Sequence, residues 1–267
     1  MITEFFQPKP KPPGTLCPEN IRKENKPGIR FVEAGPLDAF LRERNLWDGV
    51  ADLKLHLGCG QKVFEGYVNV DYPGEHHAVM SDIQADIFAD ILKLDCSRGS
   101  VSEIRLHHVF EHFNRVTGLA QLLRWSLWLK PGGRLIIETP DIEGMARRFL
   151  NTRDHEVRMG LARHIAGDQS SPWGYHLEHW WPERYVRTLE ALNFRIEAVA
   201  SERWEQTPFL SNVVVVASLK SQANPDATKA ALYAILRESM INATEEPTFL
   251  VWKAQLDELL ANQQPFI

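Results

Sequence analysis

The sequence predicts a doubly wound α/β fold with a mainly parallel sheet, an antiparallel edge strand and a C-terminal helical extension. Strand-like apolar runs alternate with helical patterns from Leu53 onward. The glycine turn Gly58-Cys59-Gly60 directly follows the first run, and the second run ends in Asp71. In such folds a glycine turn lets the backbone approach a nucleotide, and an acid at the next strand end accepts hydrogen bonds from ribose hydroxyls. The stretch 53–72 therefore predicts a site for a nucleoside-bearing cofactor.

The remaining elements follow in an order that supports this sheet. Beyond the runs at 53–57 and 67–70, strands are expected at 85–91, 101–109 and 134–141, with a hairpin-like pair at 194–204 and 212–219. Helices are expected at 118–129, 142–165 and 183–193. Pro140 breaks the fifth strand, and Asp141 is expected to cap the helix that follows. The late pair of strands predicts the antiparallel edge.

Three regions are expected along the chain. Residues 1–50 form an arm and lead-in, in which the proline-rich stretch 7–27 is extended. Residues 51–220 form the α/β domain, and residues 221–267 form two amphipathic helices. These helices either pack against the main domain, which we favour, or form a dimerising helical hairpin.

Composition and charge exclude several function classes. The 267 residues carry a formal charge of −5, which offers no overall attraction for nucleic acid or an anionic membrane. Cys17, Cys59 and Cys96 lie far apart with no CxxC pair, so neither a disulfide framework nor a thiolate zinc site is indicated. The N-terminus has acid and prolines where a signal peptide needs an apolar core. We therefore expect a cytoplasmic protein without nucleic-acid or membrane partners.

The glycine turn does not favour a dinucleotide. The dinucleotide fingerprint needs a third glycine, and Val63 stands in its place. Taken as a set, the motifs "LHLGCG", "VNVDY", the expected strand end at Asp90, "HHVFEHF" and "LKPGGRLIIETPD" resemble the class I S-adenosylmethionine-dependent methyltransferases. More narrowly, they resemble the methyltransferase type 11-like group, over about residues 53–216. The resemblance implies a Rossmann-like fold, S-adenosyl-L-methionine as cofactor and S-adenosyl-L-homocysteine as product.

The resemblance also implies a role for particular residues. It places the turn Gly58-Cys59-Gly60 against the amino-acid end of the cofactor and Asp71 on the ribose hydroxyls. The further cofactor-binding residues that it implies are Asp90 near the adenine amino group, Ile91 beside the ring, and His108 and Val109 below the sulfonium. All of these positions lie at the carboxyl ends of expected strands, where ligands of open α/β sheets bind.

Two features depart from the family pattern. The acid usual two residues before the first glycine is replaced by His56, so the cofactor's amino group would need another partner. Only residues 58–66 join the first two strands, fewer than the roughly dozen that a parallel crossover usually needs. The first helix must therefore be a single turn or irregular.

The segment "LHHVFEHF" supplies the first group of candidate catalytic residues. His108, Glu111 and His112 lie where the fourth strand ends and the next helix begins. Alternation along the strand would place His107 and His108 on opposite faces. The structural alternative for Glu111 and His112 is a pair that holds the start of the helix, where an acid is favourable.

The segment "GYHLEHWWPERY" supplies the second group. His176 and His179 could serve as bases beside an aromatic platform of Trp180 and Trp181. The structural alternative is that both tryptophans anchor this segment on the sheet. The H-x-x-H spacing differs from the helical zinc motif, and no metal is expected.

These residues together predict an S-adenosylmethionine-dependent methyltransferase. The expected acceptor is an oxygen or nitrogen nucleophile on a small molecule or glycan-linked partner. Two alternatives stay open: a non-catalytic methyltransferase-like binding or regulatory protein, and an NAD(P)-dependent oxidoreductase. The acceptor loops are grafted onto a shared core, so the sequence indicates the cofactor better than the acceptor.

Overall fold

A computed structural model describes residues 29–30, 36–73, 83–204, 207–222 and 224–262. The proline-rich stretch at 7–27, expected to be extended, lies outside these ranges. Across the described parts of the chain, no helix combines the length and apolar character needed to cross a membrane.

The chain forms one mixed sheet with the strand order β1-β4-β3-β2-β5-β6-β8-β7. The strands are β1 (Ile29–Arg30), β2 (Leu53–Leu57), β3 (Val68–Asp71), β4 (Ile87–Phe88), β5 (Val101–His107), β6 (Leu129–Pro140), β7 (Phe194–Trp204) and β8 (Thr207–Leu219). Neighbouring strands are parallel except at β8, which runs antiparallel to both β6 and β7. The predicted Rossmann-like, mainly parallel sheet with a hairpin at its antiparallel edge is confirmed.

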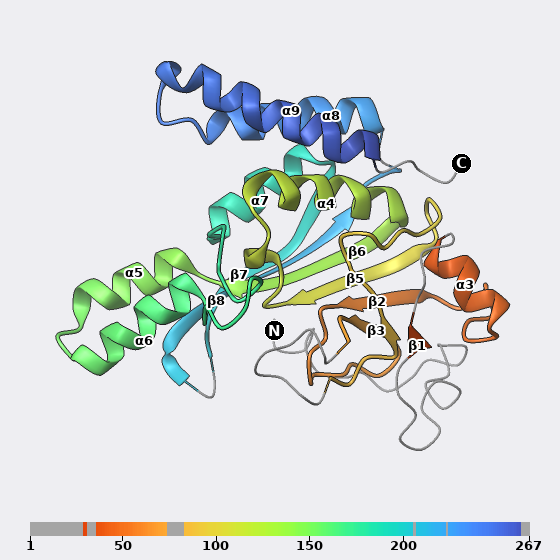
Figure 1. Cartoon of the computed structure of the whole chain (residues 1–267), viewed down its shortest axis with the longest axis horizontal. Coiled ribbons are helices and arrows are strands. Elements are labelled where there is room, and N and C mark those ends of the chain that lie inside the picture. The colour runs from red at the N-terminus through yellow and green to blue at the C-terminus, as the bar shows by residue number, and fades with distance from the viewer. Residues whose placement is uncertain (1–28, 31–35, 74–82, 205–206, 223, 263–267) are drawn as a thin grey trace.

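Helices cover the sheet and extend beyond it (Figure 1). They are α3 (Leu37–Glu43), α4 (Arg115–Trp128), α5 (Ile142–Asn151), α6 (His155–Ala166), α7 (Pro182–Ala191), α8 (Pro225–Glu238) and α9 (Glu246–Asn262), with the short 3-10 helices η2 (Phe110–His112) and η3 (Ala243–Glu245). In Figure 1, α4 and α7 lie over the sheet, α8 and α9 form a further layer outside them, and α5 and α6 lie beside the far end of β7 and β8.

The two faces of the central strands differ in chemistry. Leu55 of β2 pairs in register with Ile104 of β5, and both are fully buried in the apolar core beneath the helices. One residue further along, His56 pairs with Arg105 on the opposite face. On this second face Glu103 is also buried, and it accepts hydrogen bonds from Tyr67 and Arg134. Buried polar groups need such partners, so this face is held by a hydrogen-bonded network instead of apolar packing.

Two expected elements are shorter or divided in the structure. The strand expected at 85–91 is only Ile87–Phe88, because Asp90 lies in a turn where its side chain accepts a hydrogen bond from Leu92 N at 2.9 Å. The helix expected at 142–165 divides into α5 and α6, because Asp154 caps a new helix by accepting from Val157 N at 3.1 Å. The predicted cap at Asp141 is present, and it accepts from Glu143 N.

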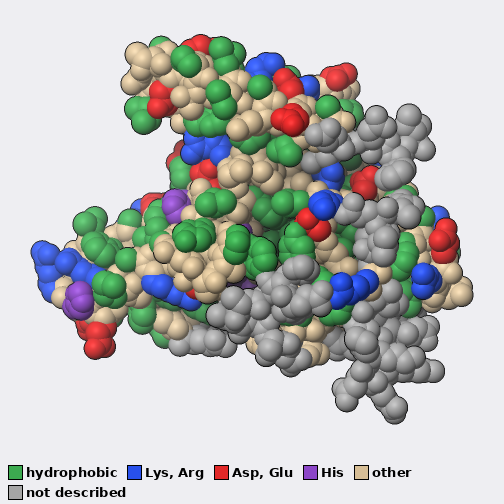
Figure 2. Space-filling view, in the orientation of Figure 1, with side chains coloured by type: hydrophobic (Ala, Val, Ile, Leu, Met, Phe, Trp, Pro, Cys, Tyr) green, Lys and Arg blue, Asp and Glu red, His purple; other side chains and the backbone are tan. Residues whose placement is uncertain are grey.

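The C-terminal helices pack onto α4. Leu232 and Leu236 of α8, with Phe249 and Leu256 of α9, are buried in the same apolar core as the central strands. Figure 2 shows that the pair projects beyond the main body at its far end. The favoured expectation that these helices pack against the main domain agrees with this contact, and dimerisation stays a prediction.

Candidate functional site

The glycine turn touches the end of β5. Gly58 and Gly60 both have positive φ angles, 69° and 53°. A Cβ atom added to Gly58 would lie 2.3 Å from Cγ2 of Val109, so only glycine fits this close approach. Gly58 follows β2 and Val109 follows β5, and the strand order reverses between these two strands. Ligands of open α/β sheets bind at such a reversal, beyond the carboxyl ends of the strands.

Asp71 joins the glycine turn to the end of β3. Its Oδ2 accepts a hydrogen bond from Gly60 N at 2.5 Å, and its Oδ1 accepts from Tyr72 N at 2.6 Å. The side chain is largely buried, and the neighbouring Cys59 donates its backbone N–H to Val70 O at 3.1 Å. The carboxylate predicted to bind a ribose thus fixes the turn that precedes it, while its contact with a ribose stays a prediction.

The loops after β3, β4 and α6 meet at this end of the sheet. The hydroxyl of Tyr72 hydrogen-bonds to Asp90; burial first, and then this bond, raises the pKa of Tyr72. The ring of Tyr72 stacks on that of Trp173, with centroids 5.8 Å apart and planes inclined at 20°. Ile91 is buried beside Asp90 in the sequence. Trp173 therefore lies over the strand ends where the adenine was predicted to bind.

His56 has a structural explanation. It is fully buried, and burial lowers its pKa to about 3, so the imidazole is neutral at pH 7. Its Nδ1 lies 3.1 Å from Oδ1 of Asn69, which also accepts from Phe64 N at 3.0 Å. The Asn69 amide in turn donates to Asp86 Oδ2 at 2.7 Å. These bonds fix the short crossover between β2 and β3, which contains no helix. His56, which replaces the acid of the family pattern, therefore has a structural role in this crossover.

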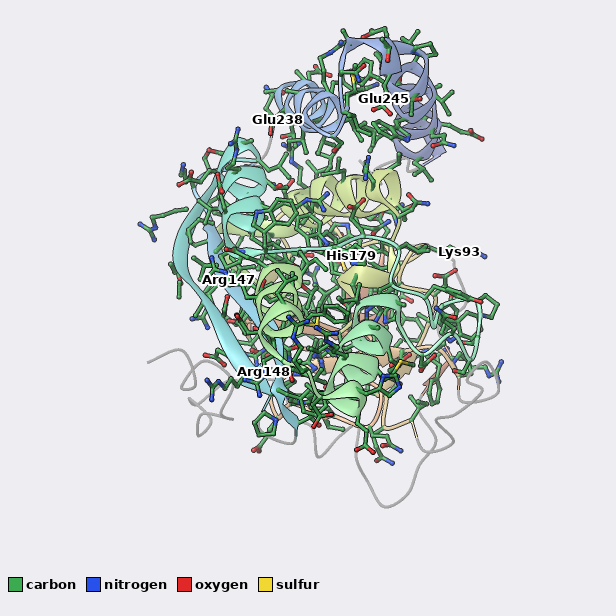
Figure 3. The ribbon with its side chains drawn as sticks, turned by 90° about the vertical axis from the view of Figure 1, so that its left-hand side faces the viewer. Lys93, Arg147, Arg148, His179, Glu238 and Glu245 are labelled. Atoms are coloured by element: carbon green, nitrogen blue, oxygen red, sulfur yellow. The ribbon has the colours of Figure 1, made fainter. Side chains whose placement is uncertain are left out.

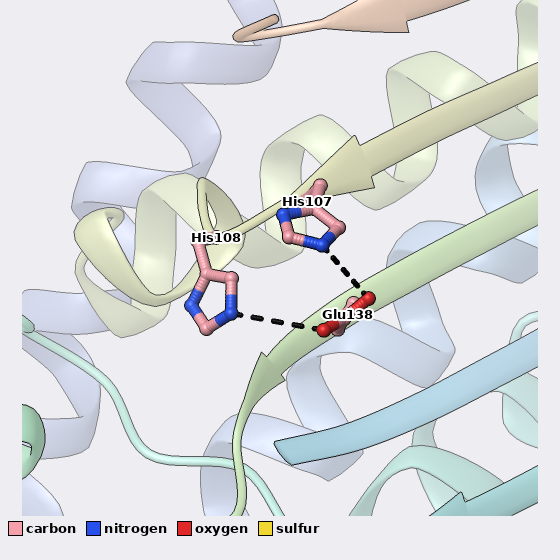
Figure 4. Close-up of side chains that lie close together, drawn as sticks. All are labelled: His107, His108 and Glu138. Carbon is pink, nitrogen blue, oxygen red and sulfur yellow. Dashed lines mark ion pairs between the residues drawn. The ribbon is translucent and has the colours of Figure 1, made fainter. Parts of the chain in front are cut away.

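His107 and His108 reach the same carboxylate, Glu138 at the end of β6 (Figure 4). Their Nε2 atoms lie 3.0 Å and 3.7 Å from its two oxygens. This differs from the expected placement on opposite faces, because the strand β5 ends at His107. The next residue, His108, has a positive φ of 53°, which turns its side chain back toward Glu138.

His108 is held between two acids. Its Nδ1 lies 3.2 Å from Glu111 Oε1, and its Nε2 lies 3.0 Å from the amide of Asn212, which donates to Glu138 at 2.9 Å. Burial alone would lower the pKa of His108, but Glu111 and Glu138 outweigh it and raise that pKa above its ordinary value. Burial likewise opposes ionisation of both acids, yet the imidazoles lower the pKa of each to about 2. His108 is therefore held in one orientation by groups on both of its ring nitrogens.

Glu111, His112 and His176 form a second group beside the first. Glu111 and His112 lie in η2, a one-turn helix ahead of α4 where a longer helix was expected to begin. His176 comes from the loop after α6, and its ring lies 4.8 Å from that of His112. The backbone of this loop is attached to η2, because Leu177 N donates to Glu111 O at 2.8 Å. The fold thus joins the two sequence clusters that were predicted separately.

The other residues of the second cluster have structural partners. Trp180 is only 3% exposed and stacks on Tyr185 with ring centroids 4.6 Å apart, as expected of a core anchor. Glu178 accepts hydrogen bonds from Arg115 and Arg184. His179 lies near the middle of the molecule in Figure 3, and its backbone carbonyl accepts from Arg184. No contact described for His179 joins it to His108 or Glu111, so its catalytic role stays a prediction.

Sequence reasoning missed several residues of the site. Glu138 and Asn212 flank His108, His164 Nε2 lies 3.3 Å from Asn212 Oδ1, and Lys62 Nζ lies 3.1 Å from His107 Nε2. An acid within the buried strand "RLIIETPD" was a signal for Glu138, since a buried carboxylate needs a partner. Nothing local marked Asn212, which lies 104 positions from His108 in the chain.

Solved structures similar to this chain include S-adenosylmethionine-dependent methyltransferases. One from Methanosarcina mazei is 14% identical, with 64% of this chain and 93% of that chain covered and a TM-score of 0.41. One from Mesorhizobium loti is 16% identical, with 62% and 90% covered and a TM-score of 0.42. The 1,6-didemethyltoxoflavin-N1-methyltransferase from Burkholderia thailandensis, solved with S-adenosylhomocysteine, is 13% identical, with 68% and 76% covered and a TM-score of 0.42. The chain matches no protein-family profile and no curated protein.

Proposed function

We propose that this protein is an S-adenosylmethionine-dependent methyltransferase. The observation that carries the proposal is the contact between Gly58 and Val109, which brings a glycine turn against the neighbouring strand end where the strand order reverses. The acceptor is an oxygen or nitrogen nucleophile on a small molecule or glycan-linked partner. The resemblance in the sequence supports the choice of cofactor.

The residues at the strand ends fit this cofactor. Gly58 and Gly60 offer backbone without side chains to the amino-acid portion, and Asp71 supplies a carboxylate for the ribose. Asp90 and Ile91 lie one strand further along, for the adenine. S-adenosylmethionine supplies a methyl group on a positively charged sulfur. The protein's own task is to orient the acceptor, exclude water and provide for the acceptor's proton.

The acceptor side is formed by the group around Glu111. His108 is fixed by Glu111 and Glu138 and acts mainly as a positioning group. Burial lowers the pKa of His176 to about 4, so its imidazole is neutral at pH 7 and keeps a lone pair on one ring nitrogen. His112 lies beside it, with Nδ1 3.0 Å from Tyr175 O.

Isothermal titration with S-adenosylmethionine and S-adenosylhomocysteine tests the proposal. We expect micromolar binding of both, no binding of NADH, and a loss of about tenfold or more in affinity for Asp71→Asn, because a hydrogen bond to a charged group contributes roughly 1.5–3 kcal/mol. Asp52→Asn, an exposed acid paired with Lys130, is the matched control and should bind normally. Binding of NADH alone would favour the oxidoreductase. Binding without methyl transfer to any class of acceptor would favour the non-catalytic protein.

A further inference from the structure

Three ligand-type side chains converge at the acceptor side of the molecule. Glu111 and His112 lie in η2, and His176 lies in the loop after α6. One nitrogen or oxygen atom from each lies within 4.8 Å of the other two. Backbone hydrogen bonds from Leu177 and Glu178 to Glu111 O hold the loop against η2, so the group is built by two attached segments.

The polar atoms of this group are incompletely satisfied. Glu111 is 1% exposed; its Oε1 faces His108, whereas its Oε2 is buried and has no hydrogen-bond partner among the described residues. The Nδ1 atom of His176 is also buried, and no described side chain or backbone group bonds to it. Its Nε2 lies 3.9 Å from Glu111 Oε1, too far for a hydrogen bond. Buried polar atoms without partners are rare in native proteins, and an ion bound here would supply a partner.

His112 has the arrangement of a metal-binding imidazole. Its Nδ1 lies 3.0 Å from the carbonyl oxygen of Tyr175, which can only accept, so Nδ1 carries the proton. The tautomer with Nδ1 protonated leaves a lone pair on Nε2. Imidazoles that bind metal ions commonly donate their other ring N–H to a backbone carbonyl in this way.

We propose that Glu111, His112 and His176 bind a divalent transition cation, with Zn²⁺ the best fit. Two imidazoles and one carboxylate form a known catalytic Zn²⁺ donor set, which leaves a fourth position open. Bonds of about 2.0–2.2 Å place tetrahedral ligands roughly 3.3–3.6 Å apart, so the side chains must close by about an ångström or more on binding. The orphaned Oε2 of Glu111 supplies the carboxylate ligand while Oε1 keeps its bond to His108.

A neighbouring group is the weaker candidate. Ligand atoms of His107, His108 and Glu138 are similarly close together. However, the Lys62 ammonium lies 3.1 Å from His107 Nε2, and Asn212 lies 3.0 Å from His108 Nε2. A metal ion there would face an adjacent positive charge and displace existing hydrogen bonds. The group around Glu111 loses no described hydrogen bond on binding the ion.

The position of the cation gives it a role in the proposed reaction, and this part rests on the proposed function. Phe110, the first residue of η2, directly follows Val109, which touches the glycine turn. An acceptor hydroxyl at the open fourth position would have a lower pKa and release its proton to water more readily. The bound oxygen would then keep the electron pair that forms the new bond to the methyl carbon. The bond between that carbon and the sulfonium sulfur would break at the same time, and its electron pair would stay on the sulfur of the leaving S-adenosylhomocysteine.

Titration of the full-length, chelator-treated protein with Zn²⁺ tests the site, with Co²⁺ as a spectroscopic probe. We expect one equivalent of Zn²⁺ to bind with micromolar or tighter affinity, and Co²⁺ to give visible absorption bands of a four- or five-coordinate ion. His176→Gln should weaken Zn²⁺ binding by about 100-fold, since it removes a ligand. His155→Gln, an exposed histidine at the start of α6, and His107→Gln, from the neighbouring group, should bind as the wild type does.

Unchanged Zn²⁺ affinity in His176→Gln, or a loss confined to His107→Gln, would overturn the proposal. So would the absence of stoichiometric Zn²⁺ binding in the wild type. Circular dichroism of the metal-free variants, with Glu111→Gln as a second ligand variant that keeps the side-chain shape, separates lost ligation from lost folding. Separate titration with S-adenosylmethionine distinguishes the two proposals. Zn²⁺ binding without cofactor binding would support the metal site and overturn the proposed function. Cofactor binding without Zn²⁺ binding would support the proposed function and overturn the metal site.

Discussion

At the scale of single residues, two positions organise the candidate site at the ends of the central strands. Gly58 is one, because its positive φ and its approach to Val109 both exclude a side chain. Asp71 is another, because its two oxygens join the glycine turn to the following backbone. Both were identifiable from sequence, since each belongs to a motif of adjacent residues at a strand end.

Replacing Gly58 with alanine tests the close approach. We expect Gly58→Ala to lower the free energy of unfolding by about 2–5 kcal/mol, because a left-handed backbone costs roughly 1–2 kcal/mol and overpacking a further 1–3. Urea unfolding measures the change. Gly66→Ala is the matched control: its φ is also positive, 80°, but nothing lies within 4 Å of the added Cβ, so only the backbone cost applies. Equal losses in the two variants would rule out the Val109 clash.

The residues that sequence reasoning missed share a physical reason. Glu138, Asn212 and Lys62 act on His107 and His108 from other elements, and their contacts depend on strand pairing and on the path of the crossover. A residue's partners across a sheet are not visible in its neighbours along the chain. The positive φ of His108 is likewise a tertiary result, which explains why the alternation rule gave the wrong side-chain direction.

At the scale of elements, the crossover between β2 and β3 shows how an irregular segment replaces a helix. The sequence predicted its irregularity from its length, but the pinning role of His56 and Asn69 was visible only in the structure. The division of the expected helix into α5 and α6 was similarly hidden, although Asp154 is a common capping residue. Apolar patterns indicated where elements exist, and capping contacts determined where they end.

The neutral imidazole in this crossover predicts a pH dependence. The pKa of His56 is about 3 in the folded protein and about 6.5 when unfolded, so between these values the unfolded chain binds the extra proton. Stability is therefore lost as the pH falls below about 6.5, by up to ~1.4 kcal/mol per pH unit. The free energy of unfolding, measured with urea at pH 7, 6 and 5, should fall less steeply with decreasing pH in His56→Gln than in the wild type. The control variant His155→Gln, at an exposed site, should show the same pH dependence as the wild type. If His56→Gln also showed that pH dependence, a neutral, buried His56 would be contradicted.

At the scale of the whole molecule, the sheet, the helices over it and the C-terminal pair form successive layers (Figure 1). The C-terminal pair is held by apolar side chains on α4 and by Arg115, whose guanidinium lies 4.7 Å from the centre of the Trp252 ring. Arg115 also bonds to Glu178 in the loop that carries His176. The outermost helices are thus linked through one arginine to the candidate functional site.

The alternative that the C-terminal helices form a homodimer belongs to this scale. Leu250 and Val251 are adjacent on α9 and more than half exposed. If these helices dimerise, light scattering of the full chain will give twice its mass of 30.6 kDa, and a combined Leu250→Asp and Val251→Asp variant will return to the single-chain mass. Leu150→Asp, an exposed leucine on α5, is the control and should leave the mass unchanged. A single-chain mass for the wild type would contradict dimerisation.

The polar face of the central strands also bears on how this sequence can change over generations. Glu103 is buried among Tyr67, Arg105 and Arg134, so replacing any one member leaves a charge or hydroxyl without its partner. The effects of such changes do not add, and a second substitution can restore what the first removed. Descendants of this chain should therefore vary at these four positions together, while Leu55 and Ile104 on the opposite face exchange singly with other apolar residues.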